Sequence, residues 1–113
     1  MIKLKRAYEQ PTKADGLRIL VERLWPRGVT KQKARIDIWL KDLAPSSALR
    51  EWYGHDPARW PEFCKRYRQE LESAGSALVL LKYLGEARPV TFVYAARDEE
   101  RNSARVLKEV LEK

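Results

Sequence analysis

Apolar and polar side chains recur along this chain with the two spacings that distinguish strands from helices. Four stretches are rich in the branched and aromatic side chains that suit a pleated, buried surface, and we predict strands there. They are residues 2–8, 18–24, 36–40 and 90–96. Residues 2–8 alternate apolar and basic side chains, so we expect a peripheral strand. Residues 90–96 form a continuous apolar run, which is typical of a central parallel strand covered on both faces.

Helical spacing predicts five further elements, at residues 30–35, 46–53, 60–72, 76–84 and 102–113. Thr30 is expected to cap the first of these helices and Ser46 or Ser47 the second, because a hydroxyl can accept a free N–H of the first turn. The helix at 76–84 is expected to end at Gly85. Cys64 lies in the apolar stripe of the helix at 60–72, which favours a buried structural thiol over a nucleophile.

The order of these elements predicts the fold class. Residues 36–40 fit two patterns, because Trp39, Leu40 and Leu43 also suit a helix, and we prefer the strand. Strands and helices alternate along the chain, with no internal repeat and no low-complexity linker. This pattern predicts an α/β fold, with a small, mostly parallel sheet flanked by helices in a single domain of residues 1–113.

Composition narrows the class of protein. No apolar run approaches the roughly 20 residues that span a bilayer, and the N-terminal residues lack the apolar segment of a signal peptide, so we expect a cytoplasmic protein with no membrane partner. One cysteine excludes an internal disulfide and, together with one histidine, excludes an ordinary Cys/His zinc site. The chain has no P-loop, Rossmann glycine pattern, Ser-His-Asp order or metal motif, and we therefore expect no metal and no cofactor.

The net charge of +7 lies entirely in the first half of the chain. Residues 1–50 hold twelve basic and five acidic side chains, whereas residues 51–113 hold eleven of each. This asymmetry favours an anionic partner, whether a phosphorylated metabolite, a nucleotide or a nucleic acid. A solvated basic surface that keeps a small protein soluble is the equally weighted alternative.

Three strand exits are the candidate site. In an open parallel sheet, ligands bind beyond the carboxyl ends of the strands, where N–H groups at helix N-termini favour anions. The exits would lie at residues 25–28, 44–47 and 97–102. If the strands are parallel neighbours, their side chains converge, and guanidinium groups could bind a phosphate or carboxylate through paired hydrogen bonds. The predicted ligand-binding residues are Arg23, Arg27, Ser46, Arg97 and Asn102.

Three residues are acid–base candidates. Glu22 and Asp98 could orient the arginines or, if desolvated, act as a general base. The alternative is that Glu22 and Arg23, and likewise Arg97 and Asp98, form structural ion pairs at the ends of strands. His55, the single histidine, could act as an acid or base, although a role in pinning its loop is favoured. The four tryptophans are spaced among apolar residues, which favours a place in the core over stacking on nucleic-acid bases.

Four long segments resemble the YeaO-like branch of a bacterial family, domain of unknown function 488. They are residues 15–28, 39–46, 49–57 and 90–98, and the resemblance covers nearly all of the chain. The family pattern usually has Asp where this sequence has Glu22. The resemblance implies an α/β fold and carries no established activity.

Longer members of the wider family are similar to this chain in having a late strand that leads into a loop before a helix. In those members the loop contains a cysteine, as does the rhodanese-type loop, where backbone N–H groups cradle a thiolate. Ala95 and Ala96 occupy that place here. The parallel implies an anion cradle without the nucleophile, and so argues against thiol-based transfer.

These observations predict an uncharacterised cytoplasmic α/β domain that binds an anionic, phosphate- or nucleotide-like small molecule at the carboxyl edge of its sheet. Whether it is an enzyme stays open, and catalysis would have to proceed without a thiol nucleophile. A nucleic-acid-binding accessory or regulatory protein is the first alternative. An interaction module without a ligand, with exposed aromatic side chains forming a dimer surface, is the second.

Overall fold

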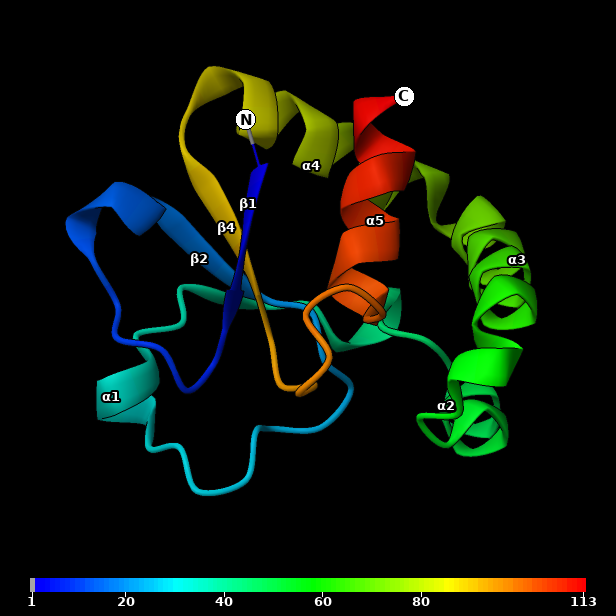
Figure 1. Cartoon of the computed structure of the whole chain (residues 1–113). Helices are drawn as coiled ribbons and strands as arrows, with labels where there is room; N and C mark the ends of the chain where they lie inside the picture. Colours follow the sequence, from blue (N-terminus) through cyan, green and yellow to red (C-terminus); the bar gives the residue numbers. More distant parts are fainter. Residues whose placement is uncertain (1) are drawn as a thin grey trace.

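The computed structural model describes residues 2–113, and its fold is built around a single parallel β-sheet (Figure 1). Its strands are β1 (Ile2–Arg6), β2 (Leu17–Leu20), β3 (Ile38–Trp39) and β4 (Val90–Tyr94), in the order β1-β4-β2-β3. Every neighbouring pair runs parallel. The predicted α/β class is therefore confirmed, with β4 central and β1 at an edge as expected.

Five helices accompany these strands in the described chain, three of them in succession between β3 and β4, and short 3-10 turns join several elements. They are α1 (Lys31–Ala34), α2 (Ser47–Tyr53), α3 (Trp60–Leu71), α4 (Gly75–Ala87) and α5 (Ser103–Glu112). The hydroxyls of Thr30 and Ser46 accept the N–H groups of Lys33 and Leu49, which confirms both predicted N-caps. The side chain of Asn102 caps α5 in the same way by accepting the N–H of Arg105.

The sheet is buried on both faces, as the apolar sequence of β4 predicts. One face carries the main core, to which α2, α3, α4 and α5 contribute, and these helices lie together on one side of the sheet in Figure 1. Val90, Phe92 and Tyr94 of β4 point into this core. Val93 and Leu20 belong to a smaller cluster on the other face, which the residues from 25 to 39 cover. Alternate residues of a strand point to opposite faces, so both clusters follow from the pleat.

Both predicted strands that flank the first helix are shorter than expected. The ladder of β2 ends at Leu20, although the N–H of Val21 still donates to the carbonyl of Val93. β3 holds only two residues, because the carboxylate of Asp37 accepts the N–H of Arg18 and so takes the place of a ladder partner. Residues 41–43 form a 3-10 turn rather than continuing either predicted element.

Gly85 does not end the fourth helix, which corrects the sequence prediction. α4 continues to Ala87, and Gly85 is buried within it. A Cβ atom at this position would lie 2.9 Å from Cγ1 of Ile2. The missing side chain therefore lets the helix approach the edge strand closely, which is a packing requirement and not a stop signal.

A buried ionic cluster holds the amino edge of the sheet together. Asp15 Oδ2 lies 2.7 Å from Nη1 of Arg18, and Lys5 Nζ lies 3.1 Å from Asp15 Oδ1. Arg18, only 3% exposed, also donates from Nε to the carbonyl of Ala34, while its Nη2 has no hydrogen-bond partner among residues 2–113. Burial acts to raise the pKa of Asp15, but hydrogen bonds from Thr12, Lys5 and Arg18 outweigh it and hold that pKa well below its usual range.

Beyond the core, a few apolar side chains are exposed. Val79, Leu80 and Tyr83 lie on α4, so the interaction-module alternative now rests on that helix and stays a prediction. All four tryptophans are half-buried against one of the two cores, as predicted. Within residues 2–113, none of the helices has both the length and the apolar character needed to cross a membrane.

Candidate functional site

A pocket of about 470 Å³ opens at the carboxyl edge of the sheet, beyond the ends of β1, β2 and β4. This is the edge at which parallel sheets bind ligands, and the volume suits a small molecule. The wall residues come from the strand exits, α2, α3 and the start of α5: Tyr8, residues 22–27, Ala44, Pro45, Arg50, Glu51, residues 53–55, Trp60, Phe63, Ala95, Ala96 and residues 101–103.

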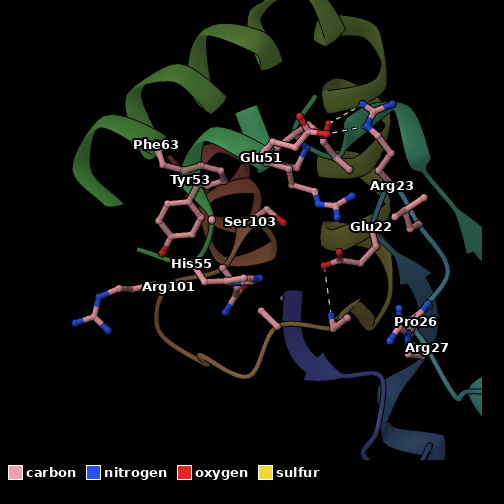
Figure 2. Close-up of a pocket in the computed structure, with 18 of the residues that line it drawn as sticks. Glu22, Arg23, Pro26, Arg27, Glu51, Tyr53, His55, Phe63, Arg101 and Ser103 are labelled. Carbon is pink, nitrogen blue, oxygen red and sulfur yellow. Dashed lines mark hydrogen bonds between the residues drawn. The ribbon is translucent and has the colours of Figure 1, made fainter. Parts of the chain in front are cut away.

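Glu22 reaches into this pocket from the exit of β2. Its Oε1 accepts the N–H of Ala95 at 3.3 Å, and Figure 2 shows the carboxyl group directed towards the middle of the site. The indole N–H of Trp39 donates to its carbonyl at 2.6 Å and fixes the backbone. Burial raises the pKa of Glu22, against the smaller opposing effects of the Ala95 N–H and the charge of Arg50.

Arg23 is a clamp on the neighbouring loop. Its Nε donates to the carbonyl of Pro45 at 3.0 Å, and its Nη2 donates to the carbonyl of Ala44 at 3.1 Å (Figure 2). These bonds join the exit of β2 to the segment that precedes α2. The guanidinium group lines the pocket, but much of its hydrogen-bonding capacity is spent on holding the wall in place.

Arg27 and Arg50 differ from Arg23 in having uncommitted guanidinium groups. Both side chains are exposed and line the pocket, and in the described part of the chain neither forms an ion pair. A fourth arginine, Arg101, pairs with Asp98 at 3.1 Å. Against these four arginines the lining has two carboxylates, those of Glu22 and Glu51. The ionisable lining is therefore predominantly cationic.

The N-terminus of α5 forms one wall. Asn102 is buried; its amide nitrogen donates to the carbonyl of Asp98 at 3.1 Å while its oxygen caps the helix. The first N–H groups of a helix have no acceptor within it, and the helix dipole makes this end favourable for negative charge. Ser103 begins α5 and lines the pocket, so the helix start adds to the cationic character of the site.

The structure brings five of the eight predicted site residues to this pocket and leaves three outside it. Those that line it are Glu22, Arg23, Arg27, His55 and Asn102, and those that do not are Ser46, Arg97 and Asp98. The residues that follow β2 and precede α5 therefore meet at one edge of the sheet, as expected. Ser46 and Arg97, which were predicted to bind the ligand together with Arg23 and Arg27, do not line the pocket.

Ser46 and Asp98 stabilise local structure. The hydroxyl of Ser46 donates to Oε2 of Glu70 at 2.6 Å and caps α2, so it is occupied between α2 and α3. Asp98 accepts the N–H groups of Arg101 and Glu100, and these bonds lower its pKa. Neither predicted structural ion pair forms among the described residues, since Glu22 bonds to the N–H of Ala95 and Asp98 pairs with Arg101 instead of its neighbour in sequence.

His55 lies at the rim, where the chain leaves α2. It adopts a positive φ of 57°, which few non-glycine residues do, and its ring lies 6.1 Å from that of Tyr53. Its side chain is exposed and lines the pocket. Figure 2 shows His55, Tyr53 and Arg101 gathered on the side of the pocket away from Arg23.

The sequence prediction missed Arg50, Tyr53, Arg101 and Ser103. Arg50 and Glu51 lie side by side in the sequence of α2, and both line the pocket. The one available signal was that Arg50 and Tyr53 are three residues apart and share a helix face. No group of three or more His, Cys, Asp or Glu side chains between Ile2 and Lys113 could hold a metal ion.

Comparisons with known proteins give a consistent result. A family model described as "Inactive DUF488-N3 subclade" matches residues 1–113. The uncharacterized protein Rv3073c of Mycobacterium tuberculosis is 44% identical over 110 residues, covering 97% of this chain and 92% of that protein. The uncharacterized protein YeaO of Escherichia coli is 35% identical over 106 residues, covering 94% and 92%. No solved structure matches the chain.

Proposed function

The chain belongs to the DUF488 family, in the subclade described as inactive, and we propose that it is a cytoplasmic domain whose pocket binds a small anionic, phosphate- or nucleotide-like ligand. The observation that carries this proposal is that the guanidinium groups of Arg27 and Arg50, which have neither an ion pair nor a hydrogen bond within residues 2–113, line one pocket with the N-terminus of α5. Guanidinium groups and helix N-termini are the protein groups best suited to oxyanions.

Binding without turnover fits the residues present. The loop that leaves β4 begins with Ala95 and Ala96, which offer no nucleophile to the pocket. Of the three predicted acid–base residues, Glu22 and His55 line the site, whereas Asp98 lies outside it and is occupied by its own loop. We therefore propose that the protein binds its ligand without converting it. If the pocket does catalyse a reaction, we propose that Glu22 or His55 acts as the acid or base.

Arg50→Gln is expected to weaken binding of inorganic phosphate, phenyl phosphate or a nucleoside monophosphate about tenfold, because it removes a charge-assisted hydrogen bond. Titration of ¹⁵N-labelled protein by NMR would measure the dissociation constants. Arg88→Gln is the matched control, since it removes the same charge from an exposed side chain that does not line the pocket. Equal affinities for the two variants, or no binding of any anion by the unaltered protein, would refute the proposal.

Salt dependence separates the nucleic-acid alternative from the small ligand. Exposed Lys31, Lys33 and Arg35 give the first half of the chain a basic surface around α1. An oligonucleotide that neutralises several phosphates there would lose affinity steeply as salt rises, whereas one small anion would show a shallower dependence. Steep dependence that Arg50→Gln leaves unchanged would favour the nucleic-acid function over the pocket.

A further inference from the structure

Resting on the proposed function, we propose that Glu22 binds the anion as a neutral carboxylic acid that donates a hydrogen bond, so that the pocket takes up one proton with each anion. Glu22 would then decide which ligands bind, because a single acid proton requires an acceptor oxygen at the floor of the site. The anion, the proton and the guanidinium groups would form one hydrogen-bonded unit.

The geometry of Glu22 supports a donor role. Oε1 already accepts the N–H of Ala95, while Oε2 has no hydrogen-bond partner from residue 2 to residue 113 and belongs to a carboxyl group that points into the pocket (Figure 2). The bond from Trp39 to the backbone carbonyl holds this residue from behind. A carboxyl group fixed in this way stays in the pocket when an anion enters, and only protonation converts their repulsion into attraction.

The charged neighbours of Glu22 do not neutralise it. No ion pair joins it to any basic group of the described chain, and the charge of Arg50 on α2 lowers its pKa by less than burial raises it. Arg23, on its own loop, is bonded to the carbonyls of Ala44 and Pro45. Desolvation already disfavours the ionised carboxyl group, and a bound anion would disfavour it further.

Other titratable groups around Glu22 define the controls. Arg27 and Arg101 also line the pocket, and burial raises the pKa of Tyr67 on α3, so that this tyrosine stays neutral. Glu51 of α2 is exposed. His55 also lines the pocket, and histidine is the side-chain type that in general gains a proton on mild acidification and then favours anions. The experiment must therefore separate Glu22 from His55.

Sulfate is a suitable probe, since it stays a dianion from about pH 5 to about pH 8 and cannot itself supply the pH dependence. Calorimetry in buffers of different ionisation enthalpy would count the protons taken up. We expect uptake approaching one proton per sulfate in the unaltered protein, and affinity that falls by up to about tenfold per pH unit as pH rises. Glu22→Gln, whose amide still donates, is expected to bind sulfate without proton uptake and with little pH dependence.

The outcomes distinguish this inference from the proposed function. Sulfate binding without proton uptake, or uptake that survives in Glu22→Gln and disappears in His55→Asn, would overturn the role of Glu22 and leave anion binding intact. No binding of any anion at any pH would overturn the proposed function itself. An infrared band of a protonated carboxyl group that sulfate increases in the unaltered protein, and not in Glu22→Gln, would support the inference without relying on affinity.

Discussion

Asp15→Ala is expected to lower the free energy of unfolding by about 3–5 kcal/mol, because it leaves the buried guanidinium group of Arg18 without its counter-ion. Arg18 is 3% exposed, and one of its nitrogens already lacks a partner within the described chain, so the guanidinium group has little means of replacing the lost bond. Urea denaturation would measure the change. Asp42→Ala removes the same charge from an exposed residue and is expected to alter stability by less than about 0.5 kcal/mol.

The contribution of Asp15 should depend on pH in a defined direction. Its pKa is lower in the folded protein than in the unfolded chain, so its stabilisation is fully present above the unfolded pKa and is lost as pH falls below that value. The difference in stability between the unaltered protein and Asp15→Asn should therefore shrink below about pH 4. A difference that persists unchanged into strong acid, or an Asp15→Ala protein as stable as Asp42→Ala, would contradict this account.

Gly16→Ala is expected to destabilise the fold by at least about 3 kcal/mol, through backbone strain and collision together. The residue has φ 65° and ψ −134°, a region essentially restricted to glycine. A Cβ atom there would lie 2.2 Å from the carbonyl oxygen of Pro89, which is backbone and cannot rotate away. That carbonyl also accepts the N–H of Leu17 where β2 begins, so relief of the collision would disturb the sheet.

Two other glycines separate strain from collision. Gly28 has φ 79° and open space where an added methyl group would lie, so Gly28→Ala should cost only about 1–2 kcal/mol. Gly75 opens α4 with helical dihedrals and equally open space, so Gly75→Ala should stabilise the protein by up to about 1 kcal/mol. Thermal and urea unfolding of the three variants should follow the order 16, 28, 75, and a Gly16→Ala protein no less stable than Gly28→Ala would rule out the collision.

Elements determined by local sequence were predictable. The apolar run of β4, the stripe of α3 and the caps at Thr30 and Ser46 each depend on residues close in sequence. Long-range contacts decided the remainder. Asp37 shortens β3 by bonding to Arg18, nineteen residues earlier, and Ile2 explains why Gly85 lies inside a helix. The local pattern of apolar and polar residues does not show that Asp37 contacts Arg18 or that Gly85 contacts Ile2. In both cases the tertiary contact overrides the local signal.

The sequence was sufficient to predict at which edge of the sheet the candidate site lies. The rule that ligands bind beyond the carboxyl ends of parallel strands located the exits of β2 and β4, and with them Glu22, Arg27 and Asn102. The same rule does not predict in which direction each side chain points. Ser46 is directed to Glu70, whereas Arg50, which was not among the predicted site residues, lines the pocket from α2.

The two edge strands of the sheet, β1 and β3, affect how copies of this protein can associate. β3 is two residues long, and β1 presents Lys3, Lys5 and Arg6 along its five residues. A very short edge strand offers too few backbone groups for another chain to pair with. A lysine-rich edge strand would bring like charges together if a second copy paired with it. The sheet is thus protected against growing into a continuous intermolecular β-structure, and self-association at high concentration is expected to leave its strand count at four.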